Sequence, residues 1–189
     1  MEENKQIDIR WHGRGGQGAI TAAKIVAAVA HASGFPGVAM IPTFGTERRG
    51  APVFTSLKLS KNEIYDLSPI EQPDIIVVLD ERLFEEAGAA AGLRPGGMVI
   101  INTPRQPEAF SFAGATTAVA DISEIAVSAG LPRGIVNSGI IGAFARATGL
   151  VPLPALLDAI GKEFKGKHWA KNVESARLAY EATVVGGKQ

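Results

Sequence analysis

The chain contains no cysteine. This excludes disulfide bonds, thiolate zinc sites, iron–sulfur clusters ligated by cysteines of this chain, and cysteine nucleophiles. An excess of either charge is also missing, because 19 Lys and Arg residues are matched by 19 Asp and Glu residues. A protein that binds the phosphate backbone of nucleic acids needs clustered positive charge, so we expect no nucleic-acid partner.

Long hydrophobic runs are missing as well. The longest apolar stretch lies around residues 25–30, and Lys24 and His31 interrupt it well short of the roughly 20 residues that span a bilayer. The N-terminus is polar and acidic, whereas a secretory signal begins with basic residues followed by an apolar run. We therefore expect a cytoplasmic protein without a membrane span.

The sequence shows no constellation typical of a catalytic centre. His12, His31 and His168 lie far apart, and no carboxylates accompany them at the spacing of a metal site or a catalytic triad. No serine lies in a nucleophile-elbow motif. We expect neither a metal site nor a catalytic residue on this chain.

Apolar residues are plentiful, since 46% of the 189 residues are hydrophobic, and we expect one domain over 1–189 with its core at 7–180. Strands that alternate with helices, followed by a helical final third, predict an α/β fold: a Rossmann-like three-layer domain with a mostly parallel sheet and a helical C-terminal part. The strands at 37–41 and 53–59 are expected to form an antiparallel or bent pair, and 184–189 a frayed tail. The remaining expected strands are 7–11, 74–80, 98–102 and 116–120, and the expected helices are 19–32, 81–91, 122–129, 138–148, 154–164 and 167–180.

The expected helix at 19–32 is apolar on almost every side, because Lys24 is its only formally charged residue. A helix that covers a sheet normally presents a polar face to water. We therefore expect a partner subunit to cover the second face of this helix.

A glycine-rich turn between the first strand and this helix is the sharpest motif. Gly13, Gly15 and Gly18 satisfy the pattern G-x-G-x-x-G, in which glycines let the backbone approach a ligand and the helix N-terminus offers N–H groups to a phosphate. No acidic residue ends the next strand, which weakens the case for a dinucleotide. The alternative is a glycine corner that serves only close helix–strand packing. Arg14 and Gln17 argue for a ligand or a neighbouring subunit, since packing alone would favour small residues there.

A second candidate is the loop of Thr46, Glu47, Arg48 and Arg49 that follows the second strand. Strand ends in a parallel sheet face one crevice, so this loop and the glycine turn are expected to line one site. Its two arginines suit an anion or the acidic group of a partner. A solvated loop with an internal ion pair to Glu47 is the alternative. The run 137–139 is expected to cap a helix.

The order of these motifs resembles a known family. The strings W-H-G-R-G-G-Q-G at 11–18 and F-G-T-E-R-R-G at 44–50, the strand at 74–79 and the helix with Lys171 and Asn172 are similar to the gamma subunit of 2-oxoacid:ferredoxin oxidoreductases. The resemblance covers residues 7–180. It implies a subunit, inactive alone, of an enzyme that oxidatively decarboxylates a 2-oxoacid to an acyl-CoA and passes electrons to ferredoxin or a similar acceptor.

The resemblance also implies a division of labour. Thiamine diphosphate and the iron–sulfur clusters belong to the alpha, beta and ferredoxin-like delta partners, whereas this chain resembles the coenzyme A-associated domain that closes over the active site of single-chain pyruvate:ferredoxin oxidoreductases. Which 2-oxoacid is used stays open. The implied coenzyme A residues are Arg14, Gly15, Gly16, Gln17, Gly18 and Lys24, and those facing the partner subunits are Thr46, Glu47, Arg48 and Arg49.

Two other functions remain open from the residues themselves. One is a free-standing nucleotide- or dinucleotide-binding Rossmann-like protein, which would bind its ligand as a monomer. The other is a structural spacer that shapes a complex without touching substrate.

Overall fold

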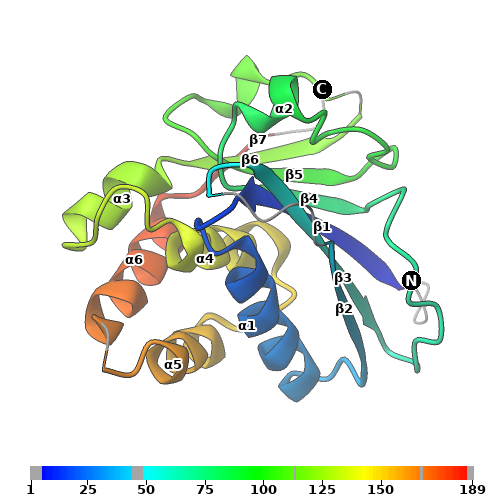
Figure 1. Cartoon of the computed structure of the whole chain (residues 1–189), viewed down its shortest axis with the longest axis horizontal. Helices are drawn as coiled ribbons and strands as arrows, with labels where there is room; N and C mark the ends of the chain where they lie inside the picture. The colour runs from blue at the N-terminus through cyan, green and yellow to red at the C-terminus, as the bar shows by residue number, and fades with distance from the viewer. Residues whose placement is uncertain (1–5, 44–48, 113, 167, 187–189) are drawn as a thin grey trace.

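The computed structural model describes residues 6–43, 49–112, 114–166 and 168–186. Within these residues the chain forms one sheet with the strand order β2-β3-β1-β4-β5-β6-β7 (Figure 1). The strands are β1 (Ile7–Arg14), β2 (Gly37–Thr43), β3 (Pro52–Ser60), β4 (Ile75–Val78), β5 (Met98–Asn102), β6 (Thr116–Ala120) and β7 (Val184–Gly186).

The sheet is mostly parallel, as predicted. Strands β1, β4, β5 and β6 pair in parallel, and β3 runs antiparallel between β1 and β2. The antiparallel pairing of β2 with β3 confirms the expectation for 37–41 and 53–59. The parallel strands place their carboxyl ends at one edge, where ligand sites of α/β sheets lie.

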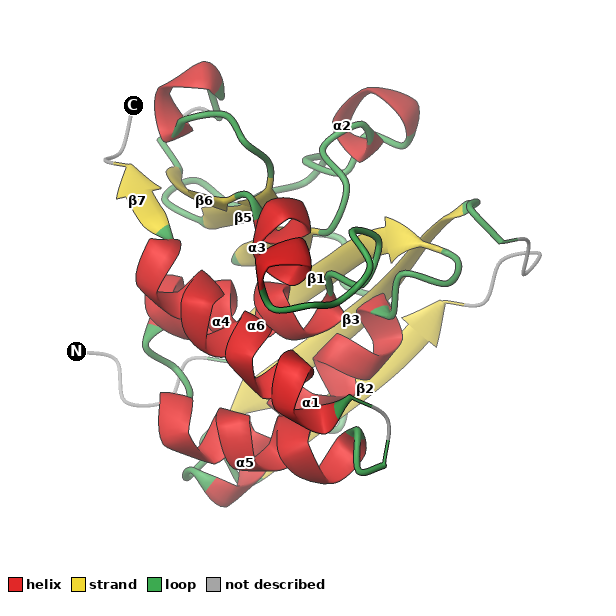
Figure 2. Cartoon of the chain, turned by 90° about the vertical axis from the view of Figure 1, so that its left-hand side faces the viewer, coloured by secondary structure: helices red, strands yellow, loops and turns green. Residues whose placement is uncertain are grey.

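The long helices lie on one face of the sheet (Figure 2). On the other face, the described residues that pack against alternate positions of β4 and its neighbours belong to the short helix α2 and to connecting segments, among them Leu83, Phe84 and Phe110. The third layer is therefore thin. The helices are α1 (Ala19–Ala32), α2 (Leu83–Glu86), η1 (Pro107–Ala109), α3 (Ile122–Ser128), α4 (Asn137–Thr148), α5 (Leu153–Glu163) and α6 (Trp169–Ala182).

The larger core lies between the sheet and the long helices. Trp11 of β1 and Phe144 of α4 are fully buried there, with ring centroids 5.3 Å apart. An aromatic pair of this size excludes several hundred Å² from water and is a large apolar contribution to stability. It fixes α4 over β1, which sets the position of the α4 N-terminus beside the glycine turn.

The chain itself covers only part of the second face of α1, because Lys24, Ala28 and His31 stay exposed, and cover of that exposed stripe by a partner subunit stays a prediction. Helix α1 packs on β1, β2 and β3 and also contacts α4 and α5. Its buried residues, among them Ala22, Ile25 and Ala30, therefore form one broad side of the helix that faces the sheet and these two helices. Sequence periodicity shows that a face is apolar, but it does not show which element covers it.

The segment 184–186 is also different from its prediction. It forms β7, which pairs antiparallel with β6 from Val119↔Val184 to Thr117↔Gly186. The free N–H and C=O groups on the outer edge of β6 give this terminal segment partners that no local pattern announces.

Helices of membrane-spanning length and apolarity do not occur in the part of the chain that the structure describes.

Candidate functional site

The glycine turn is held by hydrogen bonds to the segment before β3 and by hydrogen bonds within the turn. The Gly15 N–H donates to the Ala51 carbonyl at 2.9 Å, and the Gly50 N–H donates to the Gly15 carbonyl at 3.0 Å. The Gln17 side chain folds back, and its Oε1 accepts from the Arg14 N–H at 2.8 Å. Gln17 therefore braces the turn rather than extending from it.

Two of the glycines serve close packing. A Cβ at Gly13 would lie 3.0 Å from Cβ of Ala19, and a Cβ at Gly18, where φ is +79°, would lie 2.8 Å from Nδ2 of Asn137. Gly16 is different, because its φ is +92° and a Cβ there would meet only the Arg49 side chain, at 3.7 Å. The packing interpretation thus accounts for Gly13 and Gly18, and Gly16 keeps the backbone open toward Arg49.

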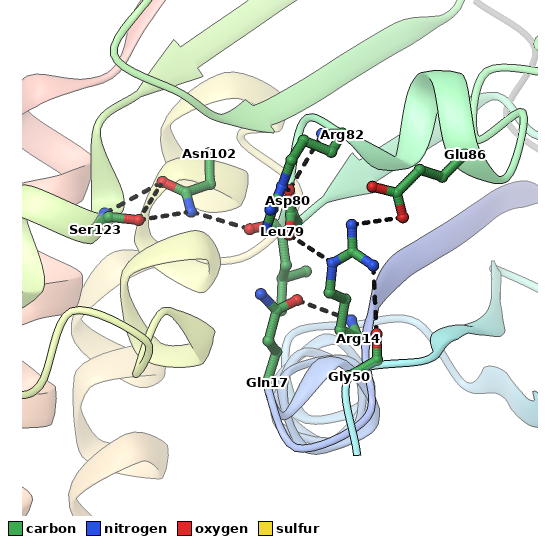
Figure 3. Close-up of polar contacts among 9 residues, drawn as sticks. All are labelled: Arg14, Gln17, Gly50, Leu79, Asp80, Arg82, Glu86, Asn102 and Ser123. Atoms are coloured by element: carbon green, nitrogen blue, oxygen red, sulfur yellow. Dashed lines mark hydrogen bonds and ion pairs between the residues drawn. The ribbon is translucent and has the colours of Figure 1, made fainter. Parts of the chain in front are cut away.

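Arg14 lies at the end of β1 and is held by acids of the β4–α2 region (Figure 3). Its Nε donates to Oδ2 of Asp80 at 2.7 Å, and its Nη2 lies 2.8 Å from Oε2 of Glu86. Its Nη1 also donates to the Gly50 carbonyl at 3.3 Å. Asp80 in turn accepts from Arg82, whose Nη2 lies 2.8 Å from Oδ2. All three guanidinium nitrogens of Arg14 are therefore engaged inside the chain.

These contacts determine the charge of Asp80. Hydrogen bonds from Arg82 and Arg14 hold the pKa of Asp80 well below its ordinary value, although burial opposes them. The lowered pKa makes the carboxylate a stabilising group at neutral pH. Its contribution is present above the unfolded pKa of about 3.9 and is lost as the pH falls through the lower folded pKa.

Replacing Arg14 with methionine is expected to raise the pKa of Asp80 toward its ordinary value, since only Arg82 remains on that carboxylate. The variant should lose stability at neutral pH and depend less on pH below about pH 4 than the wild type. Urea unfolding from pH 7 to pH 2 measures this. Lys24→Met, which removes an exposed ion pair, is the control. Equal acid slopes for Arg14→Met and wild type would contradict the assignment.

A cleft of about 520 Å³ opens at the glycine turn. Arg49, which lies three residues before β3, faces Gly16 across this cleft. The N–H groups of Gly16 and Gly18 have no acceptor among the described residues, and no side chain caps α1. The N-terminus of a helix with unpaired N–H groups and a nearby guanidinium suits an anion. The lining residues are Arg14, Gly15, Gly16, Gly18, Ala19, Ile20, Arg49 and Val53.

A second cleft, of about 510 Å³, lies at the carboxyl ends of β4, β5 and β6. Asn102 stands in it and donates from Nδ2 to the Leu79 carbonyl at 2.9 Å and to Oγ of Ser123 at 3.1 Å (Figure 3). Gln17 and Asp80 also line this cleft, so the braced glycine turn forms its wall toward the first cleft. Within the described residues, no group of His, Asp and Glu could hold a metal ion.

The structure brings together some of the predicted site residues and separates others. Arg49 joins the glycine turn in one cleft, as predicted, but not through adjacent parallel strands, because β3 lies between β2 and β1 and pairs antiparallel with both, from Arg14↔Pro52 onward. Lys24 does not line that cleft, and its Nζ lies 3.5 Å from Oε1 of Glu163 on α5. Thr46, Glu47 and Arg48 lie outside the described residues.

Three residues of this region escaped the sequence interpretation. Asp80 and Glu86 fall within the predicted strand at 74–80 and the predicted helix at 81–91, and the sequence patterns assign neither of them a role at the site. Asn137 was expected to act as a helix cap, but the N-cap of α4 is Val136, and Asn137 is buried against Gly18. The sequence did contain a signal for Asp80, because an acidic residue at the carboxyl end of a parallel strand faces the strand-end crevice and is therefore a candidate site residue.

Comparison with known proteins gives one consistent group. The family model described as pyruvate ferredoxin/flavodoxin oxidoreductase matches residues 8–182. A relative from Thermococcus litoralis, described as the common gamma subunit of pyruvate/ketoisovalerate oxidoreductases, is 44% identical over 184 residues, which are 95% of this chain and 98% of the relative.

Two solved structures resemble the chain. Pyruvate oxidoreductase subunit PORC from Thermotoga maritima has a TM-score of 0.81 and 33% identity, and the match covers 96% of this chain and 99% of that one. The 2-oxoglutarate:ferredoxin oxidoreductase from Magnetococcus marinus, with 2-oxoglutarate, coenzyme A and succinyl-CoA bound, has a TM-score of 0.74 at 20% identity, over 94% of this chain and 31% of that one. At that identity the second likeness shows the fold alone.

Proposed function

Because the chain belongs to the pyruvate ferredoxin/flavodoxin oxidoreductase family, as a gamma subunit, we propose that it works in a multi-subunit enzyme that oxidatively decarboxylates a 2-oxoacid. In this proposal the product is an acyl-CoA and the electrons pass to ferredoxin or a similar acceptor. The chain itself helps to bind coenzyme A, to close the active site and to assemble the complex. It has no activity alone.

The observation that carries the role in binding coenzyme A is the cleft at the glycine turn. Coenzyme A supplies the thiol that accepts the acyl group, and its phosphates are the groups this chain is fitted to hold. The free N–H groups of Gly16 and Gly18 and the guanidinium of Arg49 meet in the same cleft. Backbone donors at a helix N-terminus together with a guanidinium are a recurrent phosphate site.

Arg14 and Lys24 have lesser parts in this proposal. Arg14 lines the cleft and contributes positive charge, but its hydrogen bonds go to Asp80, Glu86 and Gly50, so it positions the turn. Lys24 is 63% exposed and adds a cation one turn into α1, held only by a long ion pair to Glu163.

The other cofactors belong to partner subunits. A chain without cysteine cannot ligate an iron–sulfur cluster through thiolates, so we place the clusters and thiamine diphosphate on the alpha, beta and ferredoxin-like delta subunits. The loop of Thr46, Glu47, Arg48 and Arg49 is proposed to face those subunits. The Thermococcus litoralis relative is a common subunit of pyruvate and ketoisovalerate oxidoreductases, and one gamma subunit shared by enzymes for two 2-oxoacids supports a substrate pocket outside the gamma subunit.

Arg49→Gln in the assembled enzyme tests the coenzyme A site. We expect the KM for coenzyme A to rise about tenfold, because the variant loses one charged hydrogen bond. Reduction of the enzyme by the 2-oxoacid alone should stay near the wild-type rate. Lys24→Gln should raise that KM less, because Lys24 is exposed and outside the cleft.

Lys162→Gln is the matched control, since Lys162 is an exposed lysine on α5 paired with Asp158. Its KM should equal that of the wild type. An unchanged KM for coenzyme A in Arg49→Gln would show that this cleft does not bind coenzyme A. Loss of assembly together with both half-reactions would mean that Arg49 contacts a partner subunit and not coenzyme A.

A further inference from the structure

The sheet face opposite the long helices contains a buried arginine without an acidic partner. Arg10 of β1 is 9% exposed. Its Nε donates to Nε2 of His12 at 2.9 Å, and its Nη2 donates to the carbonyls of Ala89, at 3.1 Å, and Ala91. Among the described residues no carboxylate lies within ion-pair distance of this guanidinium.

A second buried cation on the same face, Lys58, does have an acidic partner. Lys58 is 2% exposed, and its Nζ reaches Asp66 at 2.8 Å. Buried charges are normally paired, because the loss of hydration is costly unless an opposite charge replaces it. Neutral acceptors satisfy some of the N–H groups of Arg10, but its positive charge stays uncompensated.

Arg10 and His12 line a cavity of about 360 Å³ between the start of β3 and helix α2. Nη1 of Arg10 has no hydrogen-bond partner among the described residues. It is also not completely shielded from solvent, unlike the unpaired side-chain atoms of Trp11, Asn137 and Ser175. Because Arg10 lines this cavity, we infer that Nη1 faces it. The other walls are almost wholly apolar: Pro52, Val53, Phe54, Leu83, Ala87, Gly88 and Ala91.

His12 adds a second donor. Burial, followed by the charge of Arg10, lowers the pKa of His12 to about 3, so the ring is neutral at physiological pH. Its Nε2 accepts from Arg10, which leaves the proton on Nδ1. The ring stacks on Phe54 with centroids 5.8 Å apart, which holds its orientation in the cavity wall.

We propose that this cavity binds a small monocarboxylate with an apolar tail. One buried guanidinium and one neutral N–H match a single negative charge, and a carboxylate is the anion that a guanidinium pairs best in a dry site. A phosphate dianion would leave charge unmatched, since the other lining residues are uncharged. The apolar walls suit a short hydrocarbon group. The site lies on the opposite face from the long helices and does not depend on coenzyme A binding.

Isobutyrate is the probe, added to the full-length chain while the imidazole resonances of His12 are followed by NMR. We expect a saturable shift with a dissociation constant in the millimolar range, and no shift with isobutyramide, which has the same shape without the charge. Arg10→Gln should weaken binding about tenfold or more, as expected for the loss of a charged hydrogen-bond donor. Circular dichroism verifies that this variant folds.

Ala87→Leu provides a second test that leaves Arg10 and His12 intact. Ala87 lies at the exposed rim of the cavity, so leucine should fill it and abolish the isobutyrate shift. Ala32→Leu, an exposed position at the end of α1, is the matched control and should bind as the wild type does.

Three outcomes would overturn the proposal. They are the absence of a saturable shift, an equal response to isobutyramide, and wild-type binding by Ala87→Leu. If isobutyrate does not bind the chain but Arg10→Gln weakens assembly of the complex, the charge is matched by an acidic group of a partner subunit, and the small-ligand proposal is wrong.

Discussion

Gly142→Ala is expected to destabilise the chain by about 3 kcal/mol or more, because the added methyl group cannot be accommodated where α4 crosses α6. A Cβ at Gly142 would lie 2.0 Å from the Ala176 carbonyl oxygen and 3.1 Å from the Ala176 Cα. These are backbone atoms, so no side-chain rotation relieves the overlap, and the two helices must separate. Helices α4 and α6 carry much of the larger core, including Phe144.

The matched control is Gly161→Ala, the same change in α5. There a Cβ would lie 3.7 Å from Val173 and 3.9 Å from Trp169, which is ordinary contact. Removing a helical glycine without overlap should stabilise the chain by about 0.5–1 kcal/mol. Urea unfolding of both variants provides the comparison, and equal midpoints for Gly142→Ala and wild type would show that the α4–α6 crossing is looser than described.

Arg14→Glu should have the second large effect, a loss of about 3 kcal/mol or more, since it removes the partner of a largely buried carboxylate and adds a like charge. The side chains of Arg14 and Asp80 are only 15% and 10% exposed, and Glu86 lies on the other side of the guanidinium. Three carboxylates would then meet at the end of β1. The turn and α2 should separate, and the cleft between them should lose its shape.

The pH dependence distinguishes charge repulsion from lost packing. Clustering raises the folded pKa of the carboxylates above their unfolded values, so the penalty appears as the pH rises through the unfolded pKa and is relieved in acid. The stability gap between Arg14→Glu and Arg14→Met should therefore be wide at pH 7 and narrow near pH 4. A gap that does not change with pH would mean that the network contributes through packing.

This result bears on the coenzyme A assignment. A charge reversal at Arg14 disturbs the fold of the turn, so a raised KM for coenzyme A in that variant would not identify a direct contact. Arg49 lies in the same cleft without an ion pair to another described residue, and it is therefore the more informative position.

Local sequence signals located most elements well. The helix at 19–32 and the strands at 98–102 and 116–120 have the predicted bounds. Gly and Pro punctuation and apolar periodicity act over a few residues, and those interactions persist in the folded chain. The helix predicted at 81–91 is shorter in the structure, Leu83–Glu86. Gly88 adopts a positive φ soon after it, and Gly92 does so at the end of the predicted range, so regular helix does not continue through this segment.

The candidate site was predictable in part. The glycine turn follows from a turn motif, and the strand-end crevice follows from the rule that parallel strands share a carboxyl edge. Arg49 reaches the turn for a different reason, because the start of the antiparallel β3 pairs with the end of β1. The role of Arg14 did not follow, since its partner Asp80 is 66 residues away along the chain. The unmatched charge of Arg10 was equally hidden, because an arginine in an alternating strand is expected to face water.

The sequence by itself determined the order of the main strands and helices from β1 to α6, the backbone freedom of the glycine turn, the exclusion of cysteine chemistry and the family. Each of these depends on residue identity or on neighbours a few positions apart. Only the tertiary structure decided that Arg14 is engaged by Asp80 and Glu86, that α4 and α5 pack against one side of α1, and that Arg10 lines a cavity whose described lining residues include no acid. These facts depend on strand order and register, which bring together residues that no short-range pattern connects.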